Sequence, residues 1–245
     1  MRLELPILLK RLFNLEGNHN PEKLLDVRES LVAFININEL YVDAQDDEDF
    51  ELARDAIRFI DALNTYAETS NKEKGYSHLR SFFKRLEKTD KWNYYDLHLF
   101  VGSINFIATV DETIALATTV IKIMDNFKSI RDTTVLEGIF ACNMCSRILY
   151  SKYFEDSTRS DLANHFDHWF SKIERLREIN DYDLGLPFIV TEIREAIFYQ
   201  KEDKLEKLST ELYEAFGEEA AGMIVSESDS YVNCNVYKML KEKVS

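Results

Sequence analysis

Two cysteines and two histidines stand at spacings that suit a metal site. Cys142 and Cys145 are three residues apart, and His165 and His168 repeat that spacing on the next predicted helix. Residues three apart share one face of a helix, and two thiolates with two imidazoles can hold zinc in a tetrahedron. Both cysteines lie in the apolar stretch ACNMCSRIL, however, where a free cysteine acts as a small buried hydrophobe. We therefore expect structural cysteines here, with no metal and no other cofactor.

The other chemically active side chains form no catalytic arrangement in the sequence. His78 and His98 are isolated, without a serine or cysteine at a spacing that would make a nucleophile and its base. The acidic run QDDEDFE, residues 45–51, lacks the glycine that a calcium-binding loop needs at its sixth position. A glycine-rich phosphate loop is also missing, and no predicted helix carries the Glu-x-x-His pattern of di-iron bundles. We predict that the protein is not an enzyme.

Polar side chains inside apolar helical segments are a different kind of candidate. Asn105 lies among apolar neighbours, Arg147 follows Asn143 by four residues, and Glu192 and Arg194 interrupt a third apolar segment. A buried amide must find hydrogen-bond partners, which can be a neighbouring backbone or the backbone of a bound peptide. Each arginine can equally form a salt bridge within the fold. The sequence alone leaves these alternatives open.

The composition favours helices and argues against nucleic acid as a direct partner. Only 7 glycines and 3 prolines occur among 245 residues, fewer than strands and tight turns usually require. The net charge is −14, whereas a protein that binds phosphates unaided needs a basic surface.

The cysteine count and the length of the apolar runs indicate the cellular compartment of the protein. The 3 cysteines show no framework spacing and indicate a reducing compartment. No apolar run approaches the roughly 20 residues that span a bilayer. The N-terminal stretch MRLELPILLKRLF has no signal-peptide cleavage site and reads as an amphipathic helix. We expect a cytoplasmic protein with no membrane partner.

Helical periodicity recurs along the whole chain. Ser, Thr, Asp or Asn repeatedly precedes an apolar-periodic segment, as at residues 71, 109 and 133, and Pro21 is placed to begin a helix. About ten to twelve helices with short loops follow from this pattern. From Glu218 onwards the periodicity weakens, and we expect a broken pair of short helices there.

Short loops force neighbouring helices to be antiparallel. We therefore predict an all-α fold, a right-handed α-solenoid of antiparallel helical hairpins similar in plan to tetratricopeptide repeats. The strict tetratricopeptide consensus is absent, and the alternative is an irregular globular bundle. No long linker divides the chain, so residues 1–245 are predicted to form a single domain.

Three segments resemble the C-terminal domain of the Rgg/GadR/MutR family of peptide-responsive transcriptional regulators. The first is the pattern W-x-Y-Y-D-L-x-L-F beginning at Trp92, followed by ETIALATTVIKIMDNF. The others are IFACNMCSRILYSKYF, residues 139–154, and NDYDLGLPFIVTEIREAIFYQKED, residues 180–203. The resemblance spans most of the chain, from about Glu22 to Gly217.

This resemblance implies a plan for the whole regulator. Family members carry an N-terminal helix-turn-helix domain that binds DNA, then a helical repeat domain that forms a homodimer and binds a short signalling peptide on its concave face. Residues 1–20 hold no helix-turn-helix pattern. We therefore expect a regulatory domain cut from a longer protein or a stand-alone sensor, with DNA contacted only through a helix-turn-helix domain not present in these residues.

The resemblance also implies a peptide-binding site. The family's Asn, about ten residues after the Trp, is replaced here by Gly102, and the nearest amide is Asn105. Asn143 matches the corresponding Asn of the next repeat, and Tyr182 is a further candidate for the same groove. The predicted peptide-binding residues are Asn105, Asn143, Arg147, Tyr150, Glu192 and Arg194.

The sequence thus predicts a peptide-pheromone-sensing regulatory and dimerisation domain. The alternative is a helical-repeat scaffold that binds a helix or a folded protein and takes no peptide ligand. A large exposed apolar patch would favour that alternative, and convergent polar groups in a groove would favour the sensor.

Overall fold

The computed structural model describes most of the chain. The described residues are 4–15, 21–39, 48–69, 71–89, 91–107, 109–154, 160–180, 186–201, 203–205, 207–208, 210–211 and 214. Tyr182 and the segment predicted from Glu218 onwards lie outside these residues. In the described part, none of the helices is long and apolar enough to cross a membrane.

All regular structure in the described residues is helical, which confirms the all-α prediction. The α-helices are α1 (Leu5–Leu15), α2 (Pro21–Glu39), α3 (Glu48–Thr69), α4 (Lys72–Lys88), α5 (Tyr94–Ser103), α6 (Val110–Phe127), α7 (Thr134–Phe154), α8 (Leu162–Asn180) and α9 (Leu186–Phe198), and a short 3-10 helix, η1 (Ile104–Phe106), follows α5.

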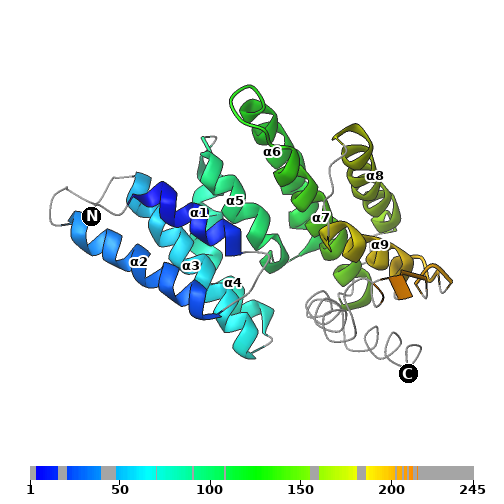
Figure 1. The fold of residues 1–245 in the computed structure, drawn as a ribbon, viewed down its shortest axis with the longest axis horizontal. Helices are drawn as coiled ribbons and strands as arrows, with labels where there is room; N and C mark the ends of the chain where they lie inside the picture. Colours follow the sequence, from blue (N-terminus) through cyan, green and yellow to red (C-terminus); the bar gives the residue numbers. More distant parts are fainter. Residues whose placement is uncertain are drawn as a thin grey trace. The chain divides into compact units, whose positions relative to one another are not determined.

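The chain divides into two compact units, residues 1–108 and 109–245. In the first unit α1, α2 and α3 each pack against the next helix, α5 packs on α3, and α4 also contacts η1 (Figure 1). Phe50, Phe59, Phe82 and Phe100 are almost completely buried in its core. The solenoid form and the single domain stay predictions.

The second unit is organised around α7. This helix packs against α6, α8 and α9, which surround it in the green-to-yellow part of Figure 1. Because neighbours cover several of its sides, α7 buries residues around most of its circumference, as a central helix must. Phe140, Ile148 and Leu149 are fully buried along it, and Phe166 of α8 is fully buried as well.

Side-chain caps fix several helix starts where the sequence predicted them. Asn71 accepts a hydrogen bond from the Lys74 N–H at 3.0 Å before α4, and Pro21 begins α2. Thr109 and Glu112 form a reciprocal capping box at the start of α6. These side chains satisfy N–H groups that have no partner within the helix.

The predicted helix over residues 92–107 is shorter than expected. Asn93 and Asp96 form a capping box, so α5 begins at Tyr94 and Trp92 lies before it. The helix then tightens into η1 after Ser103, which is a common way for a helix to end. The Trp92 indole donates a hydrogen bond to the Leu86 carbonyl at 3.2 Å. Trp92 therefore joins the loop before α5 to the end of α4.

Candidate functional site

The six predicted peptide-binding residues are divided between the two units. Asn105 lies in η1 of the first unit, where 9% of the residue is exposed. The other five belong to the second unit: Asn143, Arg147 and Tyr150 lie on α7, and Glu192 and Arg194 lie on α9. Since α7 and α9 pack against each other, these five residues come from neighbouring elements.

The α7 residues occupy one stripe of the helix, because they are spaced by four and three positions. Asn143 and Tyr150 are half-buried at the two ends of this stripe. Arg147, between them, is 0% exposed, and its guanidinium lies 5.7 Å from the centre of the Tyr150 ring. In this conformation a ligand can reach Asn143 and Tyr150, and it would reach Arg147 only if the surrounding helices moved apart.

One side of α9 faces the cysteines of α7. Thr191 and the Cys142 thiol share a hydrogen bond, and the positive charge of Arg194 lies close to both Cys142 and Cys145. Burial raises the pKa of both thiols even though the arginine acts in the opposite direction. Both cysteines are buried, as the apolar sequence context predicted, and thiols held in the protonated form are poor nucleophiles.

Glu192 points to a different neighbour. Its carboxylate lies 3.8 Å from the Lys204 ammonium. The adjacent Glu195 is bonded to Lys201 at 2.5 Å and to Lys204 at 3.0 Å. Burial alone would raise the pKa of Glu195, but hydrogen bonds from the two lysines outweigh it and lower that pKa. Glu192 therefore belongs to an ion-pair group after α9, while Arg194 faces α7.

The two cysteines and two histidines do not assemble into the zinc site that their spacing permits. Cys142 lies against Thr191 of α9, whereas His168 lines a groove beside α6, and His165 is bonded to Asp161 at 3.0 Å. Among the described residues, no group of three or more His, Cys, Asp or Glu side chains is placed to hold a metal ion.

Two buried hydroxyls add to the polar interior around α7. The Ser146 and Ser151 hydroxyl oxygens have no hydrogen-bond partner among the described residues, and each residue is at most 1% exposed. Most buried polar groups in native proteins are bonded. The core helix of the second unit thus carries polar atoms that the described packing does not use.

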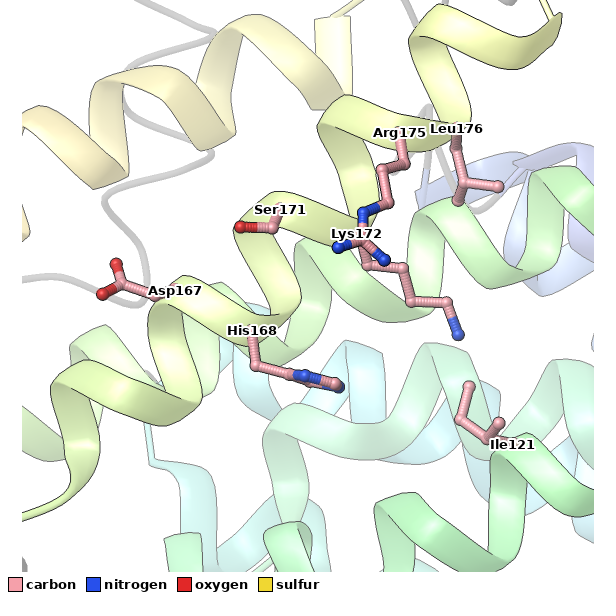
Figure 2. Close-up of a pocket in the computed structure, with 7 residues that line it drawn as sticks. All are labelled: Ile121, Asp167, His168, Ser171, Lys172, Arg175 and Leu176. Atoms are coloured by element: carbon pink, nitrogen blue, oxygen red, sulfur yellow. The ribbon is translucent and has the colours of Figure 1, made fainter.

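A groove beside α8 is a site that the sequence reasoning missed. It has a volume of about 610 Å³ and is lined by Ile121 of α6 and by Asp167, His168, Ser171, Lys172, Arg175 and Leu176 of α8. Figure 2 shows His168, Lys172 and Arg175 extending from α8 on the side of Ile121, while Asp167 and Ser171 lie on the other side of the helix in this view.

The charges around this groove are only partly balanced. The Lys172 ammonium lies 3.7 Å from the Glu137 carboxylate, which also accepts a bond from the Thr133 hydroxyl and pairs with Lys128, at 3.0 Å each. Arg175 forms no hydrogen bond or ion pair within the described part of the chain. Arg175, one of the two cations that line the groove, is therefore not neutralised by a described carboxylate, in a protein whose total charge is −14.

One sequence signal could have pointed to this groove. His168, Lys172 and Arg175 are spaced by four and three residues, which places three basic or titratable groups on one face of a helix. The spacing does not reveal that Ile121 of α6 forms the opposite wall. That wall depends on packing between helices distant in the sequence.

Comparisons with protein-family models, with curated proteins and with solved structures find no match to this chain.

Proposed function

We propose that the chain is the peptide-sensing regulatory and dimerisation domain of an Rgg-like transcriptional regulator. In this proposal it acts in the cytoplasm as a homodimer, and DNA is contacted only through a helix-turn-helix domain of the kind carried by such regulators. The observation that supports the proposal best is the packing of α7 against α9, two apolar helices that carry half-buried Asn143, Tyr150 and Arg194.

These side chains have the chemistry that peptide recognition needs. An Asn amide both donates and accepts, so Asn143 can bond the N–H and C=O groups of an extended backbone whatever the peptide's sequence. The Arg194 guanidinium can bind a carboxylate of the peptide. Tyr150 offers an aromatic surface with a polar tip. Arg147 is fully buried, with its guanidinium 5.7 Å from the centre of the Tyr150 ring, and the proposal assigns it no direct contact with the peptide.

The proposed mechanism is a shift between two populated conformations. A peptide that binds one arrangement of the helices more tightly than another changes their ratio by the ratio of the two affinities. Because α7 contacts α6, α8 and α9, a displacement at α7 would reach every long helix of the second unit. The buried Ser146 and Ser151 hydroxyls are groups that such a rearrangement could bring into hydrogen bonds.

The test is a fluorescence anisotropy titration with labelled short hydrophobic peptides. We expect saturable binding in the micromolar range or tighter, weakened at least about tenfold by Asn143→Ala or by Arg194→Ala, which corresponds to about 1.4 kcal/mol. The matched controls are Asn126→Ala and Arg80→Ala, which change exposed residues of α6 and α4 and should leave affinity unchanged.

Each variant is first checked by circular dichroism and by its unfolding midpoint. Asn143→Asp, which keeps the size of the side chain and removes its amide donors, serves if Asn143→Ala does not fold. Equal affinity in all variants would refute the assignment to α7 and α9. Absence of binding by any peptide to the folded dimer would favour the scaffold alternative. Asn105→Ala tests separately whether the first unit contributes.

A further inference from the structure

The groove between α6 and α8 combines an arginine that has no ion pair among the described residues with an apolar wall. We propose that it binds a single carboxylate joined to an apolar chain. The inference rests on the residues of the groove alone, so it does not depend on the peptide-sensing proposal. Its volume of about 610 Å³ lies within the range of small-molecule sites.

The positive charge comes from one face of α8. Lys172 and Arg175 both line the groove together with His168, and Figure 2 shows all three side chains on the side of Ile121. The one acidic lining residue, Asp167, already accepts a hydrogen bond from the Tyr199 hydroxyl at 2.5 Å.

The balance of charges favours a singly charged ligand over a phosphate dianion. Glu137 lies 3.7 Å from Lys172 and offsets much of that lysine's charge. The nearby charge of Asp125 raises the pKa of Lys172, and that of Lys128 lowers it. Of the two cations that line the groove, Arg175 is the one without an ion pair among the described residues. Its planar guanidinium matches the two oxygens of a carboxylate.

The apolar part of the groove is suited to an alkyl or apolar side chain. Ile121 and Leu176 line the groove, and the methylene stem of Lys172 adds apolar surface next to its charged end. The Lys172 ammonium lies 5.7 Å from the centre of the Trp169 ring. A ligand with its carboxylate at Arg175 would therefore lay its apolar part toward Ile121.

Two sources could supply this chemistry, a free aliphatic acid or the C-terminal carboxylate of a hydrophobic peptide. The experiment uses one probe pair for each source. Isothermal titration calorimetry compares octanoate with 1-octanol, which lacks the charge, and compares one hydrophobic peptide with its C-terminally amidated form. For a ligand of octanoate's size we expect a Kd of about 0.1–1 mM, with no saturable binding of the alcohol.

The variants separate the charge from the apolar wall. Arg175→Gln should weaken the carboxylate probe about tenfold, because it removes the charged partner and leaves the exposed surface otherwise intact. Ile121→Ser should also weaken it by removing apolar contact. Arg177→Gln, an exposed position on the same helix, is the matched control and should change the Kd by less than about twofold.

The outcomes distinguish the two sources and the two proposals. Octanoate binding that depends on Arg175 supports a free acid, and tighter binding of the acid peptide than of its amide, abolished by Arg175→Gln, supports a peptide terminus. The inference is overturned if octanoate fails to saturate at about 10 mM and the acid and amide peptides bind alike. Peptide binding that responds to Arg194→Ala and not to Arg175→Gln would leave the proposed function intact while removing this site.

Discussion

The two units use their buried polar groups in different ways. In the first unit Asp55 and Asp96 are each 1% exposed, and Arg85 donates to both, at 2.8 and 2.6 Å. Arg58 also bonds Asp55, at 2.6 Å. This network ties α3, α4 and α5 together, so its charges serve the fold.

The second unit keeps polar atoms that its described contacts do not use. The buried Ser146 and Ser151 hydroxyls lack partners among the described residues, and Arg175 stands in a groove without an ion pair there. Polar groups that do not stabilise a fold are candidates for binding. The two units therefore differ in how far their described contacts use their buried polar atoms, and our proposals place ligand binding in the second unit.

Breaking the network of the first unit should have the largest effect. Arg85→Ala leaves two buried carboxylates without a common partner, and we expect the free energy of unfolding to fall by about 3–5 kcal/mol. Urea denaturation followed by circular dichroism measures this loss. The control Arg80→Ala, on an exposed position of the same helix, should stay within about 0.5 kcal/mol. A loss below about 1 kcal/mol for Arg85→Ala would mean that the network does not hold the unit together.

A close contact in the first unit should be nearly as sensitive. A Cβ added at Gly75 would lie 2.5 Å from the Phe106 ring and 3.2 Å from the Ala62 carbonyl oxygen. Gly75→Ala should therefore destabilise by about 1–3 kcal/mol through overpacking, despite the better helix propensity of alanine. The thermal unfolding midpoint measures the change, with the exposed Ser77→Ala as control. A raised midpoint would show that α3, α4 and η1 have room to separate.

The ion pairs after α9 give a smaller effect that depends on pH. The pKa of Glu195 is lower in the folded chain than its ordinary value of 4.5. The stabilisation is therefore complete above about pH 4.5 and is lost as the pH falls through the folded pKa. Glu195→Gln should cost about 1 kcal/mol at pH 7 and less at pH 3. Urea titrations of the parent and variant at both pH values test this, and an equal cost at the two would refute the charge-based explanation.

The smallest effect is expected at the groove. Arg175 has no ion pair in the described part of the chain, so Arg175→Gln should change the free energy of unfolding by less than about 0.5 kcal/mol. The same urea titration used for Arg85→Ala gives a direct contrast between an arginine that the fold uses and one that it does not. A loss above about 1 kcal/mol in the free energy of unfolding would show that the fold does use Arg175.

Local features of the fold could be predicted from the sequence. Asn71 and Thr109 cap helices where their positions indicated, because a side-chain oxygen next to an apolar-periodic segment acts over only a few residues. The start of α5 was placed too early, since the aromatic pattern includes Trp92 while the capping box begins at Asn93.

The candidate site could be predicted only in part. The sequence pointed to Asn143, Arg147 and Arg194 and could not show that Arg147 is completely buried. That burial arises because α6, α8 and α9 all pack on α7, which is a property of the assembled unit. The groove at Arg175 was missed for the same reason, since its second wall comes from Ile121 of another helix.

The central claim is that ligand binding belongs to α7 and α9 of the second unit. Hydrogen–deuterium exchange, measured with and without a saturating hydrophobic peptide, tests it most directly, because each segment of the chain is followed separately. We predict that the peptide slows exchange in residues 143–150 and 191–198 and leaves residues 48–88 unchanged. Slower exchange confined to residues 48–107, or no change in any segment, would contradict the account.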